Sequence, residues 1–156
     1  MKRFLCTFLL LILLPVMASA ETFDLSVNLY NAMATQFGLK ELQNEDMWET
    51  VSGDSTRRTF HISDNLEVVF YLRSENVYGF GAVALSPEAY VDFLAACSSG
   101  AFVMVGDKWS NVCSELMISF FYARAGKESQ RSVVGKTLYG ITNLGDGKIM
   151  FLMMGE

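Results

Sequence analysis

Three short turn-forming segments constrain how this chain can fold. Ser52-Gly53-Asp54-Ser55, Ser63-Asp64-Asn65 and Ser74-Glu75-Asn76 separate four runs of strand-forming residues, at 47–51, 57–62, 66–73 and 77–85. Gly, Asn, Asp and Ser favour tight turns, and so short a connection joins antiparallel neighbours. The sequence therefore predicts a four-stranded antiparallel meander.

A second hairpin is predicted near the C-terminus. Gly145-Asp146-Gly147 separates residues 136–143 from residues 148–154, and a glycine-rich turn of this length favours a hairpin. The polar stretch 127–135 before it is expected to be a loop. Together the two patterns predict an antiparallel sheet.

Helical patterns surround the meander. Asp24 is expected to cap a first helix, and Gly38 fits a left-handed cap at its end. The apolar stripe of this helix is expected to be Leu25, Leu29, Tyr30, Met33 and Phe37. Ser86-Pro87-Glu88 is typical of a helix start, and this second helix is expected to reach about Ser98 and to loosen at Ser99-Gly100.

A third helix is expected from a cap at Asp107 to about Arg124, ending near Gly126, whereas residues 101–105 suit either a helix or a buried strand. The fold class predicted is α+β, with about three helices packed on one face of the antiparallel sheet. No repeat or linker divides the chain, so residues 21–156 are expected to form a single domain.

The first twenty residues have the pattern of a secretory signal peptide. Lys2 and Arg3 precede an apolar run at residues 4–16, and Ala18-Ser19-Ala20 is a signal-peptidase site. We expect cleavage after Ala20 and a periplasmic or secreted protein of the bacterial envelope. No later apolar run is expected to span a bilayer, so the processed chain is expected to be soluble, without stable membrane insertion.

Charge argues against nucleic acid as a partner. The whole chain has a net charge of −5, and removal of residues 1–20 leaves 10 basic and 17 acidic side chains, a net charge of −7. Nucleic-acid-binding domains are usually basic, so we expect none here. A content of 51% hydrophobic residues also argues against a disordered chain.

The processed chain keeps two cysteines, Cys97 and Cys113. Each falls on the apolar face of an expected helix, and export favours pairing of an even number of cysteines. We therefore expect a structural disulfide between them. Their spacing is not that of a redox-active C-x-x-C pair, and the single histidine, His61, provides no partner set for zinc.

The turns also predict which side chains share a face of the sheet. A three-residue turn at 63–65 pairs Ile62 with Leu66 and Phe60 with Val68, which puts the apolar residues on the core face. His61 then lies opposite Glu67, and Tyr71 lies opposite Gly79. The same pattern puts Tyr78, Phe80, Ala82 and Ala84 on the core face.

The opposite, outer face contains the candidate binding residues, which are Arg57, His61, Glu67, Tyr71, Arg73, Gly79 and Gly81. One interpretation is a shallow binding face with a glycine floor; the other is an ordinary solvated face on which Tyr71 covers the glycines. A His61–Glu67 pair could act as a general base, but no nucleophile or metal ligand accompanies it. We therefore predict no catalytic residues, no cofactor and no metal.

The C-terminal strand is apolar on both of its faces. Residues 149–154 suit a central strand buried between layers, or an edge strand that pairs with another chain. Copper binding by thioethers is the alternative, although Met153 and Met154 point to opposite faces.

These features predict an exported, non-enzymatic module that binds a protein or peptide through the outer sheet face or the C-terminal strand. A homodimer is left open. The alternatives are a small-ligand carrier with a pocket between sheet and helices, or an enzyme that uses His61 and Glu67.

Overall fold

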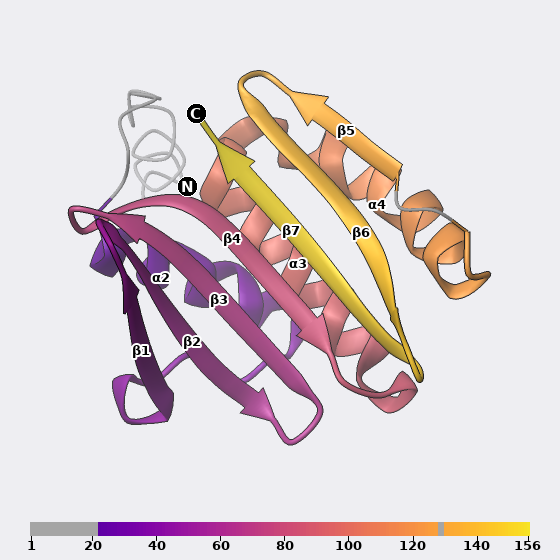
Figure 1. Cartoon of the computed structure of the whole chain (residues 1–156), viewed down its shortest axis with the longest axis horizontal. Coiled ribbons are helices and arrows are strands. Elements are labelled where there is room, and N and C mark those ends of the chain that lie inside the picture. Colours follow the sequence, from indigo (N-terminus) through magenta and orange to yellow (C-terminus); the bar gives the residue numbers. More distant parts are fainter. Residues whose placement is uncertain (1–21, 128–129) are drawn as a thin grey trace, which may run out of the picture.

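A seven-stranded antiparallel sheet with helices on one face forms this molecule (Figure 1). The computed structural model describes residues 22–127 and 130–156, and the expected signal peptide lies outside them. The strands are β1 (Met47–Ser52), β2 (Ser55–Ser63), β3 (Leu66–Arg73), β4 (Asn76–Ala84), β5 (Gln130–Val134), β6 (Thr137–Gly145) and β7 (Lys148–Gly155). Their order in the sheet is β1-β2-β3-β4-β7-β6-β5. The predicted α+β class, meander and C-terminal hairpin are confirmed.

Among the described residues, three α-helices lie behind the sheet in Figure 1: α2 (Phe23–Ala34), α3 (Tyr90–Val105) and α4 (Trp109–Arg124). Short 3₁₀ turns occupy Thr35–Phe37, Asn44–Asp46, Pro87–Ala89 and Gly106–Lys108. The layer between sheet and helices is filled by fully buried aromatic rings, those of Tyr30, Phe60, Phe70, Phe80, Phe93 and Phe151. The sheet face away from the helices is the outer face.

Strand β5 was not predicted. Gln130–Val134 pairs with β6 and is an edge strand of the sheet, where a loop was expected. The reason is tertiary, because β6 already belongs to the sheet and offers its free edge. Gly135, at a φ of 61°, forms the tight turn that returns the chain.

The buried side of α2 differs from the predicted stripe. Phe23, Ser26, Tyr30 and Ala34 are buried, whereas Leu25 and Phe37 are nearly half exposed. The helix begins one residue before Asp24, and Thr22 is its N-terminal flanking residue. Packing determines this rotation, since Tyr30 lies in the aromatic core against Phe70 and Phe80. Gly38 adopts the predicted left-handed conformation after the helix, at a φ of 78°.

Helix α3 continues through Ser99-Gly100, where loosening was expected. A side-chain carbon at Gly100 would collide with the ring of Phe80, so this glycine allows β4 and α3 to approach closely. The ambiguous residues 101–105 are therefore helical. Pro87 starts a 3₁₀ turn, and Asp107 also lies in one rather than capping α4 directly.

Judged by length and composition alone, the helical segment Pro87–Arg124 is long and apolar enough to cross a membrane. The sequence was expected to contain no such run after residue 20. The segment is not one straight helix. Gly106, at φ 56° and ψ −123°, breaks it into α3 and α4, each of 16 residues. At 1.5 Å per residue, each helix is about 24 Å long, which is shorter than a hydrocarbon core of about 30 Å. Both helices contact the sheet and each other.

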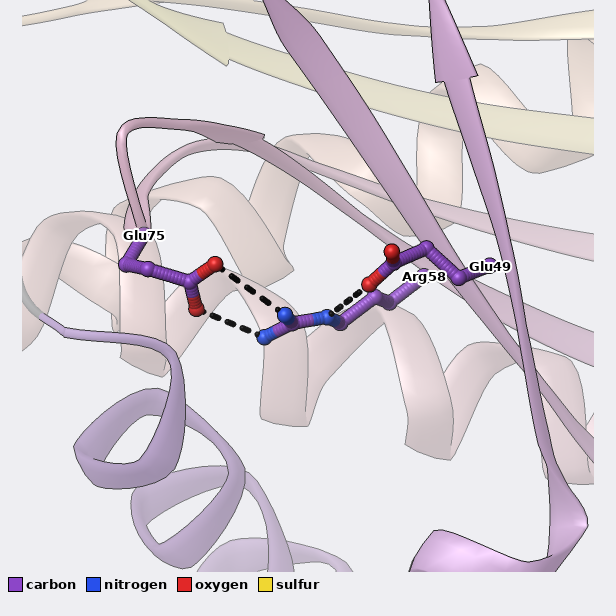
Figure 2. Close-up of polar contacts among 3 residues, drawn as sticks. All are labelled: Glu49, Arg58 and Glu75. Atoms are coloured by element: carbon purple, nitrogen blue, oxygen red, sulfur yellow. Dashed lines mark hydrogen bonds and ion pairs between the residues drawn. The ribbon is translucent and has the colours of Figure 1, made fainter.

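Arg58 joins three elements at the start of α2 (Figure 2). Its guanidinium donates to Glu49 on β1 at 2.8 Å and to both carboxylate oxygens of Glu75, in the β3–β4 turn, at 2.9 and 3.1 Å. The same guanidinium lies 4.3 Å from the centre of the Phe23 ring. The Arg58 side chain is only 16% exposed.

Strand β7 lies inside the sheet, hydrogen-bonded to β4 on one side and to β6 on the other. The alternative that the C-terminal strand is a free edge for another chain is therefore wrong. Ile149, Phe151 and Met153 are buried toward the helices. Met154 is on the opposite face from Met153, as predicted, and is paired with Gly79.

Candidate functional site: the outer sheet face

Most of the residue pairs predicted between the strands are present in the structure. His61 pairs with Glu67, Phe60 with Val68 and Tyr71 with Gly79. The prediction of an Ile62–Leu66 pair is wrong, because Ser63 pairs with Leu66 after an irregularity between His61 and Ser63. The turn therefore has two residues and a bulge before it, a combination that keeps the same faces as a three-residue turn.

His61 lies between Glu67 and an aromatic ring that sequence reasoning did not include. Its Nδ1 is 3.3 Å from Oε1 of Glu67, and its ring centre is 4.0 Å from that of Trp48 on β1. The imidazole is 56% exposed. Neither neighbour is a nucleophile, so the geometry supplies a polar contact between His61 and Glu67 and an aromatic contact with Trp48. The sequence contains a signal that could have located Trp48. The two-residue turn Gly53-Asp54 pairs Ser52 with Ser55, and continuing this register along β1 puts Trp48 opposite Thr59 on the outer face.

The two glycines of β4 are covered by side chains. A carbon at Gly79 would lie 2.5 Å from the Met154 sulfur, and one at Gly81 would lie 3.6 Å from the Tyr71 ring. Leu152 also contacts the space above Gly81, at 3.8 Å. Tyr71 is half-buried, and this burial raises its pKa while Arg57 nearby acts in the opposite direction. Side chains therefore fill the space above both glycines, and this part of the outer face has no open groove at Gly79 or Gly81.

Tyr78 lies on the outer face, and the prediction that it faces the core is wrong. A register shift between Tyr71 and Leu72 adds Tyr78 as an extra residue on β4. Its hydroxyl is 2.8 Å from that of Ser55, and its ring is 6.4 Å from that of Tyr71. The guanidinium of Arg73 lies 5.1 Å from the same ring.

Nine outward positions on three neighbouring strands carry no charge, whereas Lys148, at the start of β7, is exposed just beyond them. The nine are Gly79, Gly81 and Val83 on β4, Met150, Leu152 and Met154 on β7, and Leu138, Gly140 and Thr142 on β6. We call these nine positions the uncharged band. Leu138 is 44% exposed, and Val133 on β5, next to Leu138, is 67% exposed. Sequence reasoning missed the band because it did not pair β7 with β4.

The charged candidates lie on one side of this band. Arg57, on β2, and Arg73, on β3, are exposed, and Glu67 is paired with His61. Arg73 has a distant carboxylate neighbour, Asp54, at 3.9 Å. On the other side Arg131, opposite Gly140 on β6, is exposed. The outer face therefore has an apolar centre with basic side chains on two sides.

Cys97 and Cys113 lie on the adjacent helices α3 and α4, but both are free thiols in this structure. Burial raises the pKa of Cys97 well above its usual value, and proximity to Cys113 acts in the same direction. Burial also raises the pKa of Cys113. The predicted disulfide stays a prediction.

A hollow of about 420 Å³ lies beside α2, and its lining includes the core residues Phe23 and Leu42. Its walls are mostly polar and include Asp24, Asn28, Asn31, Gln43, Asn44 and Glu45. Within residues 22–127 and 130–156, no group of three or more His, Cys, Asp or Glu side chains is placed to hold a metal ion. Comparison with protein-family models, curated proteins and solved structures found no match to this chain.

Proposed function

We propose that this protein is an exported, non-enzymatic module that binds a protein or peptide partner through its outer sheet face. The uncharged band carries the proposal. An antiparallel sheet packed on one side normally exposes polar side chains on the other. Here the outward Val, Leu and Met side chains of three adjacent strands are partly exposed instead, Leu138 most of all. Contiguous apolar surface of this kind marks interaction sites.

The composition of the band also suits a partner surface. Met150 and Met154 have flexible, polarisable side chains, which adapt to the shape of an apolar ligand. We assign the His61–Glu67 pair to binding, because the imidazole contacts the Trp48 ring and Val69 and Val83 lie beside Glu67. A cross-strand pair of this kind stabilises the sheet by about 0.2–1 kcal/mol.

Photo-crosslinking tests this proposal. A benzoylphenylalanine introduced at Leu138 or Val133 would form an adduct with a partner held on the band when the producing cells are irradiated. Val91, a 78% exposed apolar residue on α3, is the matched control on the other side of the molecule. We expect the same partner in the Leu138 and Val133 adducts and not in the Val91 adduct. Folded variants without adducts, or with the same adducts at all three positions, would contradict the proposal.

N-terminal sequencing tests separately whether the protein is exported and cleaved. The N-terminal sequence of the protein recovered from the periplasm or medium is expected to begin at Glu21. Recovery of a chain that still begins at Met1, or recovery from the cytoplasm alone, would contradict this part of the proposal.

A further inference from the structure

We infer that the occupant of the outer face is an amphipathic helix of the partner that bears acidic side chains beside its apolar stripe. This inference rests on the proposed function and specifies its partner. It combines three observations, which are the uncharged band, the basic residues beside it and the lack of free backbone groups on the face of a sheet.

The backbone argument favours a helix. Strands β4, β7 and β6 are hydrogen-bonded on both sides, so their outer face offers side chains and no backbone partners. A partner in extended conformation would bury its own N–H and C=O groups there unpaired, which is costly. A helix satisfies these groups internally and presents only side chains. Helices α3 and α4 already cover the opposite face of the same sheet in this way (Figure 1).

The charges favour acidic side chains on that helix. Arg57, Arg73 and Arg131 occupy outward positions, and Glu67, paired with His61, is the acidic side chain among the predicted site residues. This basic surplus occurs on a processed chain whose net charge is −7. Complementary charges at the rim of an apolar interface guide encounter and determine orientation. Within the described residues, Arg57 has no carboxylate within 4 Å, unlike Arg58.

The dimensions suit one helix across the strands. Arg57, Tyr71, Gly79, Met154, Leu138 and Val133 follow one another through the pairings from β2 to β5. Strands lie about 4.8 Å apart, so these five steps cover about 24 Å, the length of a helix of about 16 residues. Acidic side chains at one end of such a helix would reach Arg57 and Arg73.

Two other occupants fit less well. A second copy of this chain would bring the same three arginines into the interface. Stable attraction to an anionic membrane usually requires about 4–8 clustered basic residues, and the net charge of the processed chain opposes it.

The test uses two synthetic helical peptides of sixteen residues that have the same stripe of Leu and Met. In one peptide the residues that flank the stripe are Glu, and in the other they are Lys. Fluorescence anisotropy would measure their affinities for the purified, processed protein. We expect the Glu peptide to bind about tenfold more tightly at low salt, and the difference to shrink at high salt because exposed charges are screened. The double variant Arg57→Glu/Arg73→Glu is expected to reverse the preference.

The matched control is Lys108→Glu/Lys127→Glu, which changes the net charge equally at exposed positions on the helical side. It is expected to keep the preference for the Glu peptide. Equal binding of both peptides, abolished by Leu138→Asp, would overturn the acidic part and leave the proposed function intact. Failure of both peptides to bind would overturn the helix inference, and the crosslinking experiment decides the proposed function separately.

Two further outcomes would also overturn the inference. One is binding to phosphatidylglycerol vesicles, but not to phosphatidylcholine vesicles, that competes with the peptides. The other is a dimer, in sedimentation, that dissociates in the Leu138→Asp variant.

Discussion

Arg57 and Arg58 are neighbours in the sequence and have opposite surroundings. Arg57 is exposed on the outer face, whereas Arg58 lies on the helix side and contacts Glu49, Glu75 and the Phe23 ring. Nearby carboxylates raise the pKa of Arg58 despite its partial burial. The alternation of a β-strand assigns such different roles to adjacent identical residues.

This difference predicts unequal costs of substitution. Arg58→Met removes two partly exposed ion pairs and a cation–π contact, so we expect the free energy of unfolding to fall by about 1–2 kcal/mol. Arg57→Met, the matched control, is expected to change it by less than about 0.5 kcal/mol. Urea unfolding measures both, and equal effects of the two substitutions would contradict the assignment.

Tyr139 predicts a pH dependence. Its hydroxyl donates to Oε2 of Glu115 at 2.6 Å, and burial, with Glu115 adding to it, raises the pKa of Tyr139 to about 12. An unfolded tyrosine titrates near 10, so this stabilisation is complete below about pH 10 and is lost as the pH rises through 12. We expect a steeper loss of stability over this interval in the native protein than in Tyr139→Phe, measured by urea unfolding at several pH values.

The Glu115 carboxylate provides an independent readout. The hydrogen bond from Tyr139 lowers the pKa of Glu115, so Tyr139→Phe is expected to move it back toward its ordinary value. Carbon-13 NMR titration measures this shift. An unchanged Glu115 titration, or the same alkaline stability profile in both proteins, would show that the hydrogen bond has no energetic role.

At the scale of elements, Gly100 determines how closely α3 approaches the sheet. Replacing a helical glycine with alanine usually stabilises a helix, by about 1 kcal/mol. Here the added carbon would collide with the Phe80 ring, so we expect Gly100→Ala to destabilise the protein by about 1–3 kcal/mol. Ser98→Ala, at a half-buried position on the same helix, is the control. A stabilised Gly100→Ala variant would contradict the packing.

The predicted disulfide between Cys97 and Cys113 would link α3 to α4. Counting thiols in the denatured, unreduced, exported protein is expected to find none. The bond would close a loop of about 15 residues, worth about 3 kcal/mol in the chain-entropy model, so reduction is expected to lower the unfolding midpoint. Two free thiols per chain would contradict this prediction.

For the whole molecule, β7 joins the two parts of the sheet. It lies between β4 of the meander and β6 of the hairpin, although it is the last strand of the chain. We expect a chain that stops after Gly147 to lose cooperative thermal unfolding, because β4 and β6 would both lose their partner. Removal of Glu156 alone is the control and is expected to preserve the transition. A truncated chain that still unfolds cooperatively would contradict the central role of β7.

The sequence by itself determined the local features of this protein. Turn residues and alternation predicted four neighbouring strands and the pairs His61–Glu67 and Tyr71–Gly79, because a short connection leaves few registers that keep one face apolar. The left-handed cap at Gly38 was likewise a local property.

Only the tertiary structure decided the long-range features. The pairing of β4 with β7 joins residues about seventy positions apart, and no local pattern specifies it. This pairing assembles the uncharged band, and the existence of β5 follows from the edge that β6 presents. The rotation of α2 and the outward position of Tyr78 depend on packing in the aromatic core and on a bulge. The physical reason is that the periodicity of side chains within a helix or strand defines which of its faces is apolar. Which apolar face is then covered depends on the elements that pack against it, and these come from distant parts of the sequence.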